Sequence, residues 1–179
     1  MKKKKKTQKP LTGQVRLARM ADIFQIYKVI RENPKEVLPR SYQDLFRNFD
    51  RFLVYDEKEK IKGVISWQVL PGPIPDEDKA LEVVSFSVRK RDQGRGIGSR
   101  LLNQMLKRLI KYHPDRILVL TFYPKFFKKF GFRRVSKKKL YSKIFLGCIN
   151  CAKYPSPLNC PEVAMEIKLS PENKEEKKK

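Results

Sequence analysis

The sequence predicts an α/β (α+β) fold in which a mixed central sheet of about six to seven strands carries helices on both faces. Three observations support this class. Segments with the two-residue period of strands alternate with segments of helical period along most of the chain. Residues 117–120 are continuously apolar, which is typical of a strand covered on both faces. A glycine-rich turn at residues 94–98 follows one strand and opens the longest helix.

The composition fits one folded domain with charged ends. The chain has 179 residues, of which 40% are hydrophobic, enough to bury a core. We expect residues 1–12 to form a disordered basic tail, residues 13–170 a single domain, and residues 171–179 a disordered charged tail. Three cysteines, an odd number, argue against a disulfide framework and favour a reducing cytoplasm. No apolar run approaches the ~20 residues that cross a bilayer, so we expect no membrane partner.

The chain is strongly basic, with a formal net charge of +23. Such a charge is compatible with nucleic-acid binding, with steering of anionic small molecules, or with lysines that are only solvated. The basic residues form no recognisable nucleic-acid motif, and the aromatic residues mostly follow core periodicity. We therefore expect no specific nucleic-acid partner.

Two short helices are expected in the first third of the chain. Ala21-Asp22 caps the first, and Asn33-Pro34 ends it. Ser41 is the expected N-cap of the second. The residues expected to face the core are Ile23, Ile26, Tyr27 and Ile30 in the first helix, and Leu45, Phe46 and Phe49 in the second.

The other elements follow from alternation and turn residues. Residues 124–130 are expected to form a short aromatic helix that ends at Gly131. Residues 71–76 contain three prolines, which forbid regular strand pairing. The expected strands are residues 15–19, 52–55, 61–70, 80–88, 117–120, 132–135 and 163–169.

The glycine turn is the main functional signal. Glycines allow a tight backbone turn, and the first N–H groups of the helix that follows have no partner inside it. Together with the helix dipole they form a site suited to a phosphate or pyrophosphate. A tight strand-to-helix connection without a ligand is the alternative. The sequence has neither the Gly-Lys-Ser/Thr of a P-loop nor the glycine spacing of a dinucleotide fingerprint.

The spacing Gln93-x-x-Gly96-x-Gly98 resembles the acetyl-coenzyme A loop of the GNAT superfamily of N-acetyltransferases. The resemblance implies the GNAT fold, with a V-shaped split between the central strand and the next one, and acetyl-CoA as cosubstrate. The loop amides would hold the pyrophosphate, and the preceding strand would pair with the pantetheine arm. The cofactor-binding residues implied are Phe86, Ser87, Val88, Gln93, Gly94, Arg95, Gly96, Ile97, Gly98, Ser99 and Phe127.

Flanking motifs across residues 14–169 resemble the short, single-domain N-acetylglutamate synthases. The implied reaction transfers acetyl from acetyl-CoA to the α-amino group of L-glutamate, the first step of arginine biosynthesis. The resemblance leaves a homodimer open. The motifs are Leu38-Pro39-Arg40-Ser41, the aromatic run of residues 126–132, and Cys148-x-x-Cys151 followed by Cys160-x-Glu162.

Acetyl transfer to an amine requires a base for the ammonium, a donor to the thioester oxygen and an acid for the thiolate. Glu82 is the expected base because it lies on an otherwise apolar strand, where burial raises the pKa of a carboxyl. A strand-end glutamate paired with a lysine is the alternative. The N–H of Val88 is the expected donor. Phe127 stands where the superfamily often has a tyrosine acid, so Tyr123 is the candidate acid.

Glutamate would bring two carboxylates to the site. Arg40 and Lys143 are the residues expected to bind them, because arginine can hold a carboxylate with two parallel hydrogen bonds. His113, the only histidine, precedes a proline in an expected surface turn, so it is not the expected base.

Several alternatives stay open at this point. The acceptor could be another amine, either free or at a protein N-terminus. The domain could also bind acetyl-CoA or nucleic acid without catalysis. The three cysteines could contribute to a zinc site, but a fourth ligand is not evident, so we expect reduced thiols and no metal.

Overall fold

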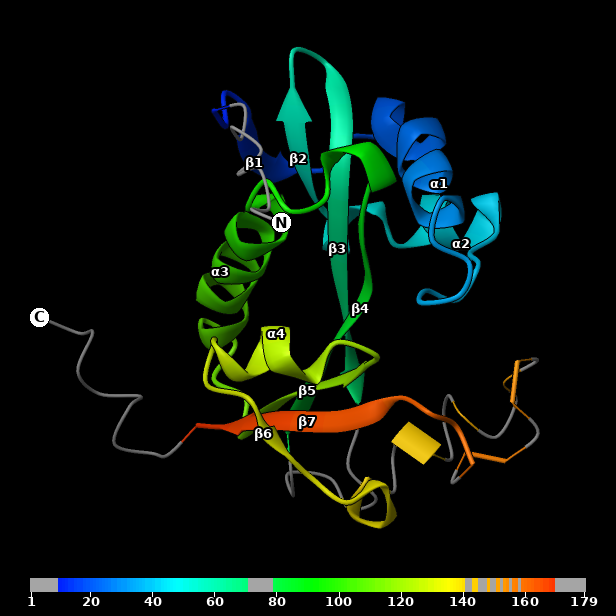
Figure 1. Cartoon of the computed structure of the whole chain (residues 1–179), viewed down its shortest axis with the longest axis vertical. Helices are drawn as coiled ribbons and strands as arrows, with labels where there is room; N and C mark the ends of the chain where they lie inside the picture. Colours follow the sequence, from blue (N-terminus) through cyan, green and yellow to red (C-terminus); the bar gives the residue numbers. More distant parts are fainter. Residues whose placement is uncertain are drawn as a thin grey trace, which may run out of the picture. The chain divides into compact units, whose positions relative to one another are not determined.

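The residues described in the computed structural model are 10–70, 79–140, 143, 144, 148, 151, 153, 154, 156, 157 and 159–169. Their elements follow the predicted order β-α-α-β-β-β-α-β-α-β-β (Figure 1). The strands are β1 (Gln14–Leu17), β2 (Leu53–Glu57), β3 (Lys60–Leu70), β4 (Ala80–Val88), β5 (Arg116–Thr121), β6 (Arg133–Arg134) and β7 (Val163–Lys168). The helices are α1 (Ile23–Arg31), α2 (Tyr42–Arg47), α3 (Ile97–Ile110) and α4 (Pro124–Lys128).

The seven strands form one mixed sheet in the order β1-β2-β3-β4-β5-β7-β6, which confirms the predicted class. β4 and β5 pair in parallel, whereas β1 with β2, β2 with β3, and β7 with both β5 and β6 are antiparallel. The parallel ladder joins residues 80–83 to residues 116–119. Ser85, with a φ of 50°, interrupts the regular backbone of β4 two residues later. The predicted split between the two strands stays a prediction.

The chain divides into two compact units, Met1–Ile65 with Ser85–Gln104 and Ser66–Val84 with Met105–Lys179. β3, β4 and α3 contribute residues to both units. The predicted loop at residues 71–76 lies outside the described residues, as do residues 1–9 and 171–179 of the predicted tails. None of the helices in the described residues is both long and apolar enough to cross a membrane.

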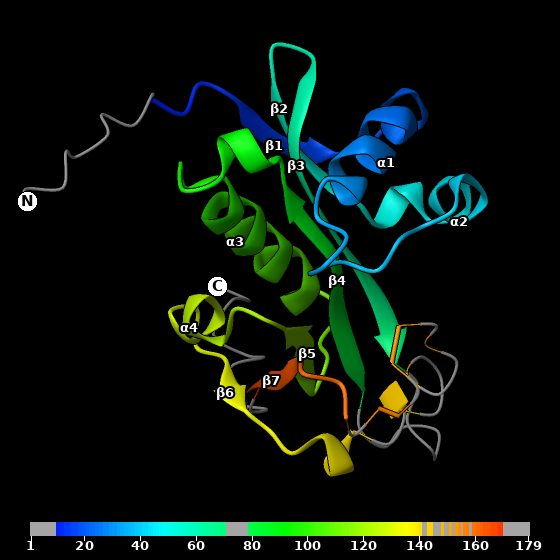
Figure 2. The same ribbon diagram turned by 45° about the vertical axis from the view of Figure 1, so that its right-hand side comes forward.

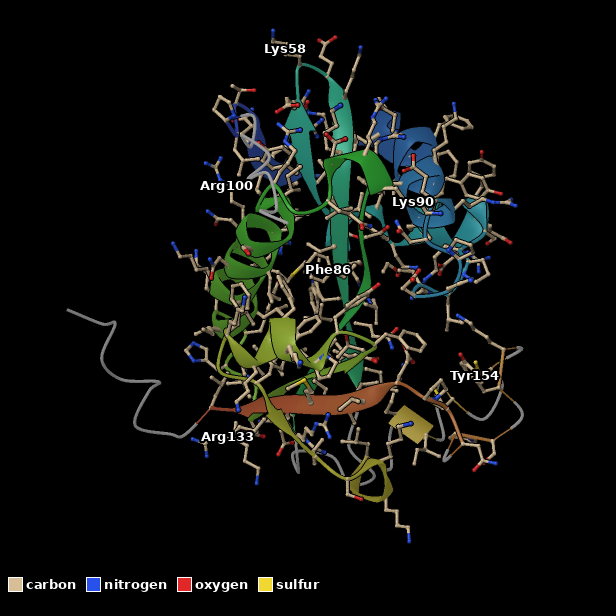
Figure 3. The ribbon with its side chains drawn as sticks, viewed as in Figure 1. Lys58, Phe86, Lys90, Arg100, Arg133 and Tyr154 are labelled. Carbon is tan, nitrogen blue, oxygen red and sulfur yellow. The ribbon has the colours of Figure 1, made fainter. Side chains whose placement is uncertain are left out.

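In the first unit, α1 and α2 lie side by side (Figures 1 and 2). Ser41 caps α2 as predicted, because its Oγ accepts a hydrogen bond from the N–H of Asp44 at 3.1 Å. Lys58 lies at the tip of the turn between β2 and β3 (Figure 3) and has a positive φ. The core of this unit contains Ala18, Ile23, Ile26, Val29, Ile30, Leu45, Phe52, Val54, Ile61 and Val64.

The second unit is built on β5 and β7, with the two-residue strand β6 at the outer edge (Figure 2). Arg133 on β6 is exposed (Figure 3). Pro124 begins α4, where its missing N–H costs no hydrogen bond, and Gly131, with a φ of 89°, follows the helix. The core here contains Leu70, Ala80, Leu118, Leu140 and Ala164.

Candidate active site

The predicted glycine turn connects β4 to α3, as expected. Gly94 and Gly96 have φ of 77° and 92°, a left-handed conformation that a side chain disfavours. Both glycines are exposed. The two glycines therefore give the turn a shape in which its backbone reaches solvent.

The turn presents several backbone donors. Within the described residues, no hydrogen-bond acceptor is present for the N–H groups of residues 95–99. The first hydrogen bond inside the helix runs from the N–H of Arg100 to the carbonyl of Gly96 at 3.1 Å. A cluster of unpaired N–H groups at the positive end of a helix is the arrangement that binds a pyrophosphate.

An ion-pair network around Arg95 holds the glycine turn in place. Arg95 lies 2.6 Å from Oδ1 of Asp92 through Nη1 and 3.0 Å from Oε1 of Glu57 through Nη2. The hydrogen bond from Arg95 lowers the pKa of Glu57 below its usual value. Lys62 adds a second cation, 3.6 Å from Oδ2 of Asp92. The side chain of Arg95 therefore anchors the turn to the β2–β3 hairpin.

Two more members of the predicted cofactor-binding set make side-chain hydrogen bonds within the protein. Ser87 is buried, and its Oγ donates to the carbonyl of Val29 at 3.0 Å. Gln93 donates through Nε2 to Oδ1 of Asn33 and to the carbonyl of Val88, both at 3.1 Å. These two side chains shape the end of β4 and the turn. Phe86 on β4 is half-buried (Figure 3).

Glu82 lies at the centre of a buried polar cluster in the second unit, with only 2% of its surface exposed. Lys143 Nζ lies 2.8 Å from its Oε1, and Gln68 Nε2 donates to its Oε2 at 2.6 Å. Burial lowers the pKa of Lys143, but the nearby Glu82 carboxylate outweighs it, so the pKa stands above its usual value. Sequence reasoning proposed Glu82 as the base and Lys143 as a carboxylate-binding residue, with a lysine-paired glutamate as the alternative. The structure shows Glu82 paired with a lysine, Lys143.

Sequence reasoning missed Gln68. Its only signal was a polar residue near the end of the largely apolar strand β3. Strand periodicity predicts the face of the sheet on which a side chain lies. It does not predict which polar group on the next strand lies opposite that side chain.

The remaining predicted residues have different surroundings. Arg40 donates through Nε to Oγ of Ser85 at 3.1 Å, and its Nη1 lies 3.2 Å from Asp44 Oδ2. Tyr123 precedes α4 and is 59% exposed. Phe127 is buried on α4, and its ring meets those of Phe126 and Phe132 edge-on. His113 is exposed, as predicted.

The three cysteines are free thiols. Burial raises the pKa of Cys148 and of Cys160. Cys160 Sγ lies 3.6 Å from Oε2 of Glu162, whose own pKa is raised by burial. Among the residues that the structure describes, no group of three or more His, Cys, Asp or Glu side chains is arranged to hold a metal ion.

The sheet order and the open glycine turn define an acyltransferase of the GNAT type. Comparison of the sequence with known families agrees, since residues 17–132 match the Acetyltransferase (GNAT) family. The chain belongs to this family, and acetyl-CoA is its cosubstrate. It is also 28% identical over 155 residues to an uncharacterized N-acetyltransferase of Chlorobaculum tepidum, covering 84% of this chain and 93% of that protein.

Two bacterial proteins are among the solved structures with a similar fold. Rv2747 of Mycobacterium tuberculosis, in complex with CoA and NLQ, superposes with a TM-score of 0.70 at 20% identity, over 88% of this chain and 99% of that chain. N-acetylglutamate synthase of Neisseria gonorrhoeae, complexed with coenzyme A and N-acetyl-glutamate, gives a TM-score of 0.70 at 19% identity. That match covers 90% of this chain and 36% of the synthase chain. At these identities the likeness establishes the fold.

Proposed function

We propose that this chain transfers the acetyl group of acetyl-CoA to the α-amino group of L-glutamate, the reaction that begins arginine biosynthesis. The observation that carries the proposal is the buried ion pair between Glu82 and Lys143. The similar fold of an N-acetylglutamate synthase that binds coenzyme A and N-acetyl-glutamate supports the same acceptor class.

A buried ion pair needs an explanation, because desolvating two charges can cost more than their attraction returns. An α-amino acid carries an ammonium and a carboxylate on one carbon atom. Its ammonium can pair with Glu82 and its carboxylate with Lys143, so the pair is complementary to a zwitterion. The N-terminus of a peptide offers the ammonium without the carboxylate. The pair therefore favours a free amino acid over a protein N-terminus.

The chemical roles follow from the residue types. Glu82 accepts the proton of the ammonium, and the freed amine attacks the thioester carbon. The C–N bond forms as the C–S bond breaks, while the N–H of Val88 donates to the carbonyl oxygen. The hydroxyl of Tyr123 supplies the proton that the departing thiolate takes up. Arg40, held by Ser85 and Asp44, binds the second carboxylate of glutamate.

The test is an acceptor panel read by release of free coenzyme A. The panel contains glutamate, glutamine, aspartate, other amino acids and a short peptide with a free N-terminus. We expect glutamate to have the highest kcat/KM, and Glu82→Gln to lose turnover with glutamate. Turnover of the peptide without turnover of any free amino acid would overturn the proposal.

A second experiment tests the carboxylate-binding role of Arg40. We expect Arg40→Ala to raise the KM for glutamate about 10- to 100-fold, the usual effect of losing a charged hydrogen bond, while the KM for acetyl-CoA stays unchanged. Arg47→Ala is the matched control, because Arg47 is an exposed arginine on α2. An unchanged KM for glutamate in Arg40→Ala excludes the role.

A further inference from the structure

The peptide group that joins Val88 to Arg89 is held from both sides. Its N–H, on Arg89, donates to the carbonyl of Lys62 on β3 at 2.8 Å. Its carbonyl, on Val88, accepts from Nδ2 of Asn33 and from Nε2 of Gln93, both at 3.1 Å. Three separate segments therefore fix the plane of one peptide at the end of β4. α1 ends at Arg31, and the two residues that follow it, Glu32 and Asn33, contact the end of β4 through Arg89 and Val88.

Asn33 is the central member of this group, with 6% of its surface exposed. Its Nδ2 also donates to Oγ of Ser87 at 2.7 Å, and its Oδ1 accepts from Gln93 at 3.1 Å. The hydroxyl of Ser87 donates its proton to the carbonyl of Val29, so its oxygen can act only as the acceptor toward Asn33. The network thus requires an amide at position 33, with its nitrogen toward β4 and its oxygen toward the turn.

The residue before Asn33 strengthens the same connection. Glu32 accepts from Arg89 Nη1 through Oε1 at 2.6 Å and from the N–H of Lys90 through Oε2 at 3.1 Å. Two consecutive residues after α1 therefore hold the backbone where β4 passes into the turn. Sequence reasoning took Asn33 only as the end of the first helix, because nothing local to it shows a partner more than fifty residues away.

We propose that Asn33 is a positioning residue for acetyl-CoA. By fixing the carbonyl of Val88 and the side chain of Gln93 together, it holds the end of β4 in register with the amides of the turn. The inference rests on the proposed roles of Val88 and the turn in binding the thioester and the pyrophosphate. A single rigid ligand engages both, so a small loss of alignment weakens both sets of contacts.

The test is Asn33→Asp in the full chain. Aspartate has the same shape and still accepts from Gln93, but it places a carboxylate oxygen where Nδ2 donated to the Val88 carbonyl. We expect the dissociation constant for CoA, measured by calorimetry, and the KM for acetyl-CoA to rise about tenfold or more, as for a lost buried hydrogen bond. The KM for the amine should stay within about twofold, because the acceptor makes no contact that Asn33 positions.

Two controls separate positioning from stability. Asn103→Asp makes the same chemical change on an exposed face of α3 and should leave CoA affinity unchanged. Ile26→Val removes one methyl group from the core and should lower the melting temperature without moving either KM. If Asn33→Asp binds CoA as tightly as Asn103→Asp, or shifts the KM values of acetyl-CoA and amine equally, the inference is wrong.

A second variant tests the positioning role of Asn33 if Asn33→Asp does not fold. Gln93 is exposed, so Gln93→Leu should fold while losing both amide hydrogen bonds to Asn33 and Val88. We expect the same selective loss of CoA affinity, and unchanged affinity overturns the inference. CoA binding does not depend on the acceptor. A chain that binds CoA but does not acetylate glutamate would therefore refute the proposed function and still test Asn33.

Discussion

Lys143 Nζ lies 2.8 Å from Oε1 of Glu82, and the exposed fraction is 14% for the side chain of Lys143 and 2% for that of Glu82. We predict that Lys143→Met lowers the free energy of unfolding by about 3–5 kcal/mol, because it leaves a buried carboxylate without its cation. Denaturant unfolding at pH 7 measures the loss.

The sign of the stability effect follows from Lys143, whose pKa in the folded state is raised above the ordinary 10.5. The stabilisation is therefore fully present below pH 10.5 and is lost as the pH rises through the folded pKa. Lys129→Met, at an exposed position after α4, is the control and should leave the free energy of unfolding unchanged. If Lys143→Met has the same free energy of unfolding as the wild type at pH 7, the ion pair contributes nothing to stability.

Gln68 should hold the second oxygen of Glu82 in place, since its Nε2 donates at 2.6 Å. We predict that Gln68→Leu lowers kcat about tenfold, the usual effect of losing a hydrogen bond to a charged group. The KM for acetyl-CoA should stay unchanged. Steady-state kinetics check the split, with Gln104→Leu on the exposed face of α3 as the control. Equal kcat in the two variants would exclude a positioning role.

The order of elements was predictable because it depends on local patterns. Apolar spacing identified α1 and α3, and Ser41 began α2 through a hydrogen bond within its first turn. The prediction was wrong for Phe46, which is 44% exposed. With six residues, α2 has fewer than two turns and buries only Leu45.

The polar groups around the site were harder to predict. Asn33 meets Val88, and Gln68 meets Glu82, across 55 and 14 positions of the chain. A hydrogen bond between distant segments produces no periodic pattern in the sequence, whereas the burial of apolar side chains does. Sequence reasoning therefore identified Glu82 and Val88 one by one, and missed the amides of Gln68 and Asn33 that hold them.

Gly96 should contribute to cofactor binding through its backbone conformation. We predict that Gly96→Ala weakens CoA binding at least tenfold, because its φ of 92° strains an L-residue by about 1–2 kcal/mol and the turn would relax out of shape. Gly131→Ala is a matched control, since Gly131 has a φ of 89° and nothing near its Cβ position. Both variants should lose similar stability, but only Gly96→Ala should lose CoA affinity by calorimetry. Equal CoA affinities of Gly96→Ala and Gly131→Ala would contradict a role for the glycine turn in cofactor binding.

The thiols of Cys148 and Cys160 should react slowly, because burial raises the pKa of both above the ordinary 9.0. We predict that iodoacetamide at pH 7.5 labels them at least about tenfold more slowly than it does in the denatured chain, since the thiolate is the nucleophile. Mass spectrometry of the labelled peptides measures the rates. Bound zinc would also protect the thiols, but a chelator would then speed labelling. We expect a chelator to have no effect.

Asp22 should couple the stability of the first unit to acidic pH. It accepts from Arg16 Nη1 at 2.6 Å, from Arg16 Nη2 at 3.0 Å and from the N–H of Arg19 at 2.7 Å. Burial raises the pKa of Asp22, but these hydrogen bonds outweigh it and hold the pKa below 3.8. A depressed pKa contributes stability that is present above pH 3.8 and is lost as the pH falls through the folded value.

We therefore predict that Asp22→Asn lowers the free energy of unfolding by about 2–3 kcal/mol at pH 7, less than the full cost of breaking a buried pair because Arg16 keeps Asp56 as a partner. The difference from wild type should shrink as the pH falls below 3.8. Asp50→Asn, at an exposed position, should show no difference at either pH. Urea unfolding at pH 7 and pH 3 checks this, and an equal loss at both pH values would show that Asp22 acts through packing rather than through its charge.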